Sequence, residues 1–469
     1  MTSTRLALGL CAAFAFAAHA APVFPRPGRR SEANVELKSP PSFAHGNQQA
    51  VYVDFQNARY ELNFDIERKS STFRSKIVFR MPKAGYPIFD VVGAIGSATL
   101  DASPVEIAEV ATPGRQSKVR LVAQVTQPGT HTLEIVHTYQ GQDQRYATGT
   151  VNFGIWTSDL QDRNFLEPYL PTSFEYDSYS MELEVNVSGA REEHVLLTNA
   201  ALTPRGTDGW SLRAPGTFMT SALYLHLTPK SAIRTVTSSY LSASGKTIPI
   251  TAYAKTSMSE RTLRGFLDGS HKHLAELEGR YGAWPHEQLL VYAQSSGGGM
   301  EYNGATITSS MALGHEIAHS YFGRGFYPAN GDSGWLDEAL NSWRDDNYPS
   351  VADAARVSRT DMAARGDYVR HTDTRAYSTG ARFIGHLHHL AEPKGGLQPF
   401  LKDFIARNLF RPVFTVDFQR SLETYLGQNL QPLFNEKVYG RAGNSSAPSE
   451  AAENPYHPRW TPTYRRGLL

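Results

Sequence analysis

Two histidines and a glutamate lie at a spacing that suits metal chemistry. The segment His315-Glu316-Ile317-Ala318-His319 has the pattern H-E-x-x-H. If the segment is helical, the two imidazoles lie one turn apart on one face, as two ligands of one tetrahedral zinc ion require. Glu316 directly follows the first histidine and can act as a base toward water at that metal. The pattern therefore indicates a hydrolytic zinc site.

A second segment offers a third ligand. Glu338 lies 19 residues after His319, within residues 335–340 (WLDEAL), which are typical of a helix. We predict that His315, His319 and Glu338 hold one zinc ion per chain and leave a fourth position for water. H-E-x-x-H also recurs by chance on ordinary helices. The WLDEAL segment, with Glu338 at zinc-ligand spacing, favours the metal site over chance recurrence. Asp345 and Asp346 are interpreted as surface charges.

The elements around this segment are predicted to be helices and short strands. After about residue 250, apolar residues recur at intervals of three, four and seven, which is typical of an amphipathic helix that Ser259 could cap. These apolar residues are Leu263, Phe266, Leu267, Leu274 and Leu277. A compact apolar strand at 289–293 and a strand through Ile307 precede the H-E-x-x-H segment. We place this second domain at 250–440.

The preceding region has the period of a β-sheet. Tyr60, Leu62, Phe64 and Ile66 alternate with polar residues, and residues 181–187 (MELEVNV) repeat the pattern. Such alternation indicates strands with one buried and one wet face. Clusters of Gly, Pro, Asn and Asp separate further short strands. We therefore predict an all-β, antiparallel domain over 50–240.

The two ends of the chain differ from these domains. Residues 1–20 resemble a secretory signal, with Arg5, an apolar run over 6–18 and the cleavage pattern Ala18-His19-Ala20. The Pro-rich residues 21–49 are predicted to form an extended linker, and residues 441–469 a mobile tail. We therefore expect an exported protein, either periplasmic or secreted, that has no membrane segment after cleavage.

Composition excludes several classes of function. The 46 basic and 45 acidic residues give a formal net charge of +1, which gives no reason to expect nucleic acid as a partner. The single cysteine, Cys11, lies in the predicted signal. A cleaved protein would therefore have no disulfide, no thiolate chemistry and no cysteine ligand for zinc. The oligomeric state does not follow from the sequence.

Four motifs in order resemble those of the aminopeptidase N family of gluzincin zinc metallopeptidases. Residues 298–302 (GGMEY) are similar to its Gly-x-Met-Glu-Asn motif, and residues 315–338 are similar to its zinc motif. Residues 335–339 (WLDEA) resemble its Trp-Leu-Asn-Glu-Gly, and residues 377–380 (YSTG) its Tyr-x-Lys-Gly. The resemblance implies an α+β protein in which an N-terminal antiparallel β domain precedes a thermolysin-like, mixed α/β and mainly helical catalytic domain.

The resemblance also implies roles for individual residues. Glu316 and Tyr377 would be catalytic, as the base and as the donor to the oxyanion. Glu301 would pair with the free α-ammonium of a peptide substrate. Gly298, Gly299 and Met300 would lie along the substrate, where the glycines allow close approach. The implied activity is hydrolysis of the N-terminal peptide bond through a zinc-activated water.

Departures from the family pattern leave alternatives open. Ser320 and Tyr321 replace Gln-Trp, Ala339 replaces a glycine and Thr379 replaces a lysine. The later domains of the family are missing from this sequence, which indicates a short, two-domain, bacterial-type member with a more open cleft. The rival predictions are a related glycyl aminopeptidase or endopeptidase, and a non-catalytic relative that binds peptides.

Overall fold

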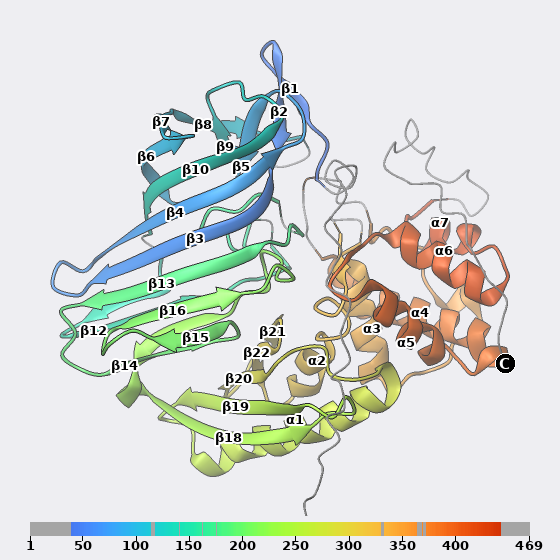
Figure 1. The fold of residues 1–469 in the computed structure, drawn as a ribbon. Coiled ribbons are helices and arrows are strands. Elements are labelled where there is room, and N and C mark those ends of the chain that lie inside the picture. Colours follow the sequence, from blue (N-terminus) through green and yellow to red (C-terminus); the bar gives the residue numbers. More distant parts are fainter. Residues whose placement is uncertain are drawn as a thin grey trace, which may run out of the picture.

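The chain folds into a β-rich part followed by a part that combines a smaller sheet with helices (Figure 1). The computed structural model describes residues 39–113, 118–139, 141–161, 163–174, 176–329, 333–363, 368 and 372–441. The predicted signal at 1–20, most of the predicted linker and nearly all of the predicted tail lie outside these residues.

The largest sheet has eight strands in the order β15-β16-β13-β3-β4-β10-β6-β7. Its strands are β3 (Asp54–Asp65), β4 (Ser70–Met81), β6 (Ala94–Leu100), β7 (Ser103–Pro104), β10 (Gly129–Thr138), β13 (Ser180–Ser188), β15 (Ala201–Pro204) and β16 (Gly209–Ala214). The predicted alternation is confirmed, since Tyr60, Leu62 and Phe64 are buried while the residues between them are partly exposed.

The prediction of a purely antiparallel domain is wrong. β13 pairs with β3 in parallel, from Ser180 opposite Asn57 to Ser188 opposite Asp65. β2 and β5 are also parallel. The chain leaves β3, forms other strands over residues 66–179 and returns in the same direction. The prediction assumed that strands successive in sequence pair as antiparallel hairpins, so it did not include this parallel pair.

Two smaller sheets complete the β-rich part. One has the order β1-β2-β5-β9-β8 and the other β11-β12-β17-β14. Their bounds are β1 (Phe43–His45), β2 (Gln48–Tyr52), β5 (Tyr86–Phe89), β8 (Ile107–Ala111), β9 (Lys118–Val122), β11 (Gln144–Ala147), β12 (Thr150–Ile155), β14 (His194–Thr198) and β17 (Leu225–Pro229). The linker predicted over 21–49 therefore differs from the structure at its end, because β1 and β2 form a hairpin around Gly46, whose φ is +59°.

A five-stranded sheet in the order β18-β19-β20-β22-β21 begins the second part. Its strands are β18 (Ile233–Leu241), β19 (Thr247–Lys255), β20 (Leu289–Gln294), β21 (Gly299–Tyr302) and β22 (Ala305–Ser309). β18 was predicted to belong to the preceding domain. It pairs with β19 over nine residue pairs, from Ile233 opposite Lys255 to Leu241 opposite Thr247, so the second part begins before the predicted boundary.

The helices of the described chain all lie in the second part. They are α1 (Glu260–Tyr281), α2 (Leu313–Ala318), α3 (Trp335–Asp345), α4 (Thr379–Ala391), α5 (Gln398–Asn408), α6 (Thr415–Leu426) and α7 (Gln431–Lys437). They share this region with the five-stranded sheet, the short pair β23 (Tyr327–Pro328) and β24 (Pro412–Val413), and long connections. The description of this part as mainly helical is therefore not confirmed. No helix among the described residues combines the length and apolarity needed to cross a bilayer.

Helix α1 follows its sequence pattern. The predicted apolar residues, from Leu263 to Leu277, are all buried. The Ser259 side chain accepts a hydrogen bond from the Thr262 backbone N–H at 3.1 Å, which satisfies one of the free donors at the start of the helix. α1 packs against β18, β19 and α2, and so supports the helix that carries the two histidines.

The β-rich part contacts the second part close to β21. The Tyr302 hydroxyl accepts a hydrogen bond from the Thr157 backbone at 3.2 Å. The Asn199 amide donates to the Asn303 carbonyl at 2.8 Å. These contacts fix the position of the GGMEY segment.

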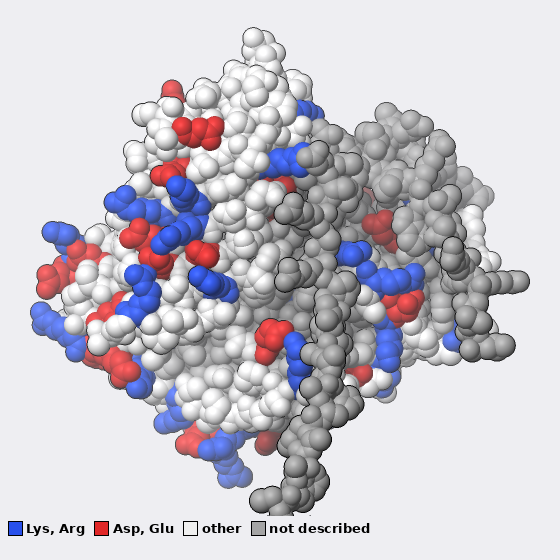
Figure 2. All heavy atoms as spheres, viewed as in Figure 1, with Lys and Arg blue, Asp and Glu red and all other residues white. Residues whose placement is uncertain are grey.

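On the face shown in Figure 2, acidic and basic side chains are interspersed and neither sign dominates.

Candidate metal centre

The two histidines lie on a short helix, and the second of them is the residue at which the helix ends. α2 covers Leu313–Ala318, and His319 follows with helical φ and ψ of −56° and −21°. The His319 backbone N–H donates to the His315 carbonyl at 3.2 Å, which places the two side chains one turn apart. The chain then turns at Gly323, where φ is +107°, a conformation that suits glycine.

The three predicted ligands converge. The Nε2 atoms of His315 and His319 are 3.1 Å apart. Glu338 Oε2 lies 3.1 Å from His315 Nε2 and 3.6 Å from His319 Nε2. Glu338 lies in the first turn of α3, where Trp335 and Leu336 are also buried. Residues far apart in sequence thus present three ligand atoms to one point.

The spacing of these atoms fits a zinc ion. Zinc bonds of about 2.0–2.1 Å in a tetrahedron place neighbouring ligand atoms about 3.3–3.5 Å apart. The three separations of 3.1, 3.1 and 3.6 Å in the structure bracket that value. Two imidazole nitrogens and one carboxylate are also the donor types that hydrolytic zinc sites use. The residues therefore fit the ion that the sequence predicts.

The charges of the cluster favour a cation at the same point. Burial lowers the pKa of His315, but hydrogen bonds to Asp345 and Glu338 raise it to about 10. Burial raises the pKa of Glu338, but the positive charge of His319 and hydrogen bonds from both histidines hold it below its ordinary value. The carboxylates thus stabilise positive charge between the rings, which a divalent ion can supply in place of protons.

Each histidine has a second partner that directs its Nε2 into the site. His315 Nδ1 lies 2.6 Å from Asp345 Oδ2, and His319 Nδ1 lies 3.0 Å from the Phe322 carbonyl. An Nδ1–H that donates outward leaves Nε2 as the ligand atom. Asp345 is exposed, as predicted, but it is more than a surface charge because it also pairs with His315. Asp345 lies seven residues after Glu338, two turns along α3, and this spacing was the signal that could have identified it.

A charged network holds Asp345 in place. Arg344 Nη1 donates to Asp345 Oδ1 at 2.9 Å, and the other terminal nitrogen of Arg344 pairs with Glu276 on α1. Glu276 also accepts a hydrogen bond from the Tyr348 hydroxyl at 2.8 Å. The network joins α1 to α3 behind His315, so it supports the orientation of that ring.

Glu316, the predicted base, lies beside the strand β21. A Cβ added at Gly299 would lie 2.5 Å from Glu316 Cγ, so the absence of a side chain at Gly299 leaves room for the carboxylate. Burial raises the pKa of Glu316 to about 8, against the lowering effect of His319 and His315. The glycine that was predicted to allow a close approach of substrate therefore allows a close approach of the base.

Tyr377 also reaches the cluster. It ends the short 3-10 helix Thr374–Tyr377, and its ring stacks on His315 with centroids 6.1 Å apart and planes 18° apart. Its hydroxyl donates a short hydrogen bond to Glu338 Oε1. Burial and the negative charge of Glu338 raise the pKa of Tyr377 well above its ordinary value, so the hydroxyl remains a hydrogen-bond donor.

Glu301 lies beside the cluster and has a partner that sequence reasoning missed. Arg324 Nη2 lies 2.9 Å from Glu301 Oε1, and both side chains are buried. The negative charges that hold His319 in its charged form include Glu301. Nothing in the sequence pattern distinguishes Arg324 from an ordinary surface arginine, because its burial results from the packing of the β-rich part over β21.

The remaining predicted residues lie on or next to the edge strand. β21 (Gly299–Tyr302) is the last strand of its sheet and pairs there with β22. Gly298 lies just before this strand, with no atom of the described residues within 4 Å of an added Cβ. Met300 is buried in an aromatic cluster with Tyr253, Tyr292 and Tyr302. It therefore packs inside the protein, whereas Gly298 and Gly299 are exposed.

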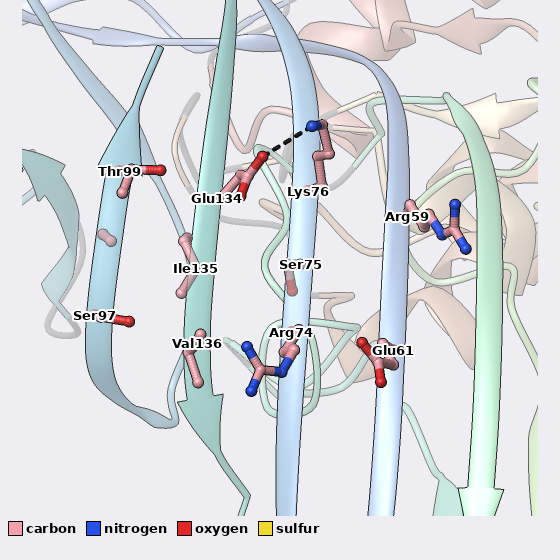
Figure 3. A pocket seen from close by; sticks show the side chains of 11 residues that line it. Arg59, Glu61, Arg74, Ser75, Lys76, Ser97, Thr99, Glu134, Ile135 and Val136 are labelled. Carbon is pink, nitrogen blue, oxygen red and sulfur yellow. Dashed lines mark ion pairs between the residues drawn. The ribbon is translucent and has the colours of Figure 1, made fainter. Parts of the chain in front are cut away.

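A separate hollow on the large sheet does not have the character of a catalytic site. Side chains from β3, β4, β6 and β10 surround it, including Arg59, Glu61 and Arg74 (Figure 3). Lys76 and Glu134 form an exposed ion pair across it at 2.9 Å. None of its lining residues belongs to the metal cluster. Exposed ion pairs of this kind contribute about 0–1 kcal/mol each, so these side chains are best explained as a solvated sheet face.

Comparisons with known proteins identify the fold. No family profile and no curated protein sequence matches the chain. A mutant M1 zinc metallopeptidase from Deinococcus radiodurans, solved with a Tyr-Ser-Ala substrate, superposes with a TM-score of 0.62 at 17% identity over 85% of this chain and 96% of its own. Aminopeptidase A from Legionella pneumophila, solved with aspartic acid, gives 0.65 at 12% identity, over 85% of this chain and 50% of its own.

A third solved structure is leukotriene A4 hydrolase from Saccharomyces cerevisiae, with a TM-score of 0.59 at 11% identity, over 85% of this chain and 68% of its own. At these identities the likeness shows a shared fold. The β-rich part and the part that follows it thus share their fold with these solved M1 zinc metallopeptidases.

Proposed function

We propose that this chain is an exported zinc-dependent aminopeptidase that hydrolyses the N-terminal peptide bond of peptides. The observation that carries the proposal is the convergence of His315, His319 and Glu338 on one point, with ligand-atom separations of 3.1 to 3.6 Å. The base candidate Glu316 lies on the same helix, one residue after His315. The fold shared with M1 zinc metallopeptidases supports the same reaction class.

His315, His319 and Glu338 would hold the zinc. Bound zinc supplies Lewis-acid chemistry, polarising a carbonyl and making water more acidic. Glu316 then accepts the proton of the attacking water and passes it to the leaving amine. The buried position of Glu316 suits this role, because burial raises its pKa to about 8 and so makes it able to take up and release a proton near neutral pH.

Tyr377 would donate a hydrogen bond to the oxygen that becomes negative as water attacks. Without substrate, its hydroxyl donates to Glu338. It would have to exchange this partner for the substrate oxygen, and its partly exposed ring, on the short 3-10 helix before α4, leaves space on one side. A donor placed where charge develops accelerates such reactions by about 10²- to 10³-fold.

The substrate would lie along the open edge of β21. An extended peptide can add there as a strand, with main-chain hydrogen bonds that do not depend on its sequence. The exposed Gly298 and Gly299 keep that edge accessible. Glu301, one residue after Met300, would then face the first residue of the peptide. The substrates in this proposal are peptides with a free N-terminus. The predicted signal over residues 1–20 supports the proposed location, which is the periplasm or the outside of the cell.

Metal content and hydrolysis, measured on the same samples, test the proposal. Wild-type chain should bind one zinc by mass spectrometry of metals and should hydrolyse aminoacyl amides, with loss of activity in chelator and recovery with zinc. Glu316→Gln should keep the zinc and lose about 10²- to 10⁴-fold in rate. Glu287→Gln, an exposed glutamate, serves as the control. A zinc-loaded wild type without hydrolysis would favour the non-catalytic, peptide-binding alternative.

A further inference from the structure

The acid that would select a free N-terminus already has a cationic partner. Arg324 Nη2 lies 2.9 Å from Glu301 Oε1. The Arg324 side chain has a relative exposure of 0% and that of Glu301 4%. A buried pair of this kind does not exchange its partner freely with solvent, because separating the two charges leaves one of them without compensation.

Arg324 is also held in place by its other contacts. Its Nη1 donates to Ser221 Oγ at 2.7 Å and approaches Met219 Sδ at 3.6 Å, both in the connection between β16 and β17 of the β-rich part. Its backbone N–H donates to the His319 carbonyl at 2.8 Å. The guanidinium is thus fixed from both parts of the molecule and is not a side chain that swings away when a ligand arrives.

A substrate ammonium bound by Glu301 would therefore lie near a fixed positive charge. Arg324 occupies Oε1, so an incoming ammonium is left with Oε2 of the same carboxylate. The ammonium gains the attraction of Glu301 but meets the repulsion of the guanidinium at only slightly greater distance, in a buried region where such charges interact strongly. An uncharged amide at the same place does not meet this repulsion.

We propose that Arg324 is a positioning residue that acts through Glu301 to relax the selection for a free N-terminus. The site would then cleave peptides with a blocked N-terminus as well as those with a free one. The substrate class is thus peptides whose first residue is acylated, or internal bonds near the end of a chain, alongside ordinary aminopeptidase substrates. This inference rests on the proposed function, because it concerns how that site selects its substrate.

Paired substrates test the inference. Two peptides of identical sequence, one with a free and one with an acetylated N-terminus, are incubated with the zinc-loaded full chain, and cleavage positions and kcat/KM are read by mass spectrometry. For the wild type, the two values of kcat/KM should agree within about tenfold, which corresponds to about 1.4 kcal/mol. A preference for the free peptide above about 100-fold would overturn the inference without any variant.

Variants of Arg324 separate its charge from its packing. Arg324→Met should increase the ratio of free to acetylated kcat/KM by more than about tenfold, because Glu301 then lacks its cation. Arg324→Lys, which keeps the charge, should leave the ratio near the wild-type value. A merely structural role would lower both values of kcat/KM together and leave the ratio unchanged in Arg324→Met. That result would overturn the inference.

Two controls keep the outcomes distinct. Arg382→Met, at an exposed position on α4, should change neither rate nor ratio. The double variant Glu301→Gln, Arg324→Met replaces both charges, so it leaves no buried carboxylate without a cation if Arg324→Met alone does not fold. Its ratio of free to acetylated kcat/KM should return toward the wild-type value. Failure of the zinc-loaded wild type to cleave either peptide would overturn the proposed function itself. A zinc-loaded wild type that cleaves only the free peptide would overturn the inference alone.

Discussion

Two clusters of acidic and histidine side chains share His319, and they differ in what balances their negative charge. In the first, ligand atoms of His315, His319 and Glu338 approach one another closely, and no lysine or arginine of the described chain pairs with Glu338. In the second, ligand atoms of Glu301, His319 and Asp337 lie within 4.8 Å of one another. There Glu301 is already paired with the guanidinium of Arg324.

The difference explains why acidic residues near a histidine do not by themselves make a metal site. In the first cluster both rings direct Nε2 inward, because Asp345 and the Phe322 carbonyl take their Nδ1 atoms. In the second cluster His319 has no further ring nitrogen to offer, and Asp337 Oδ1 accepts a hydrogen bond from the Glu338 backbone at 2.9 Å. A metal fits the first cluster, whereas in the second cluster Glu301 is already paired with a protein cation.

The largest effect is expected where the two clusters meet. His319→Ala removes a ligand from the first cluster and the shared ring from the second. Zinc affinity should fall by more than the about 10- to 100-fold that loss of an outer partner costs, and hydrolysis should become undetectable. Zinc content after dialysis and the rate of aminoacyl amide hydrolysis are the measurements. His271→Ala on α1, whose ring lies against Ser238, should retain both zinc and activity.

A second prediction separates the base from the metal. Gly299→Ala places a methyl group against the Glu316 side chain and should displace it. Hydrolysis should fall by about 10²-fold, since a displacement near 1 Å has that cost, while zinc remains bound. Gly265→Ala, at an exposed position on α1, is the control, because its added Cβ meets open space among the described residues. Equal losses in the two variants would contradict the placement of Glu316 against β21.

A third prediction tests the outer partner of the first cluster. Asp345→Asn weakens the acceptor that holds His315 Nδ1 and should lower zinc affinity by about 10- to 100-fold. Titration with a competing chelator measures the affinity. The exposed neighbour Asp346, changed to Asn, should leave it unaltered. An unchanged affinity in Asp345→Asn would mean that the first cluster is oriented by its backbone alone.

The smallest predicted effect concerns the network behind His315. Burial raises the pKa of Glu276, but hydrogen bonds from His273 and Arg344 hold it at about 2. The pKa of Glu276 is thus lower in the folded chain than in the unfolded chain, where it is about 4.3. Ionised Glu276 therefore stabilises the folded chain above that pH, and this contribution is lost as pH falls from about 4.3 toward 2. Glu276 is partly exposed, so the loss should be below about 1 kcal/mol.

Urea unfolding at several pH values compares the wild type with Glu276→Gln. The wild type should lose stability across this window, and the variant should lose less. Glu260→Gln, an exposed position on the same helix, should follow the wild type. Parallel curves for wild type and Glu276→Gln would show that the network does not couple α1 to α3.

Local patterns predicted much of the fold, and contacts between distant segments account for the errors. The alternation from Tyr60 to Ile66 and the apolar stripe of α1 each concern one element, and the structure confirms both. The parallel pairing of β3 with β13 depends on where a long excursion returns. The membership of β18 in the second sheet depends on pairing with β19, which alternation within a strand does not specify.

The site shows the same division. His315 and His319 are four residues apart, so helical geometry alone brings them together. The role of Asp345 was within reach, because it lies two turns after Glu338 on the same face of α3. The pairing of Arg324 with Glu301 was not, since it depends on Ser221 and the β-rich part closing over the guanidinium. Packing between the two parts determines which acids remain without a cation.

The central claim is that three side chains from α2 and α3 bind one zinc ion. X-ray absorption at the zinc edge, on full-length chain loaded with one equivalent, tests it most directly. The account predicts nitrogen and oxygen ligands at about 2.0–2.2 Å, including two imidazoles, and loss of that signature in Glu338→Ala. A wild-type chain that takes up no zinc, or a spectrum unchanged by Glu338→Ala, would contradict it.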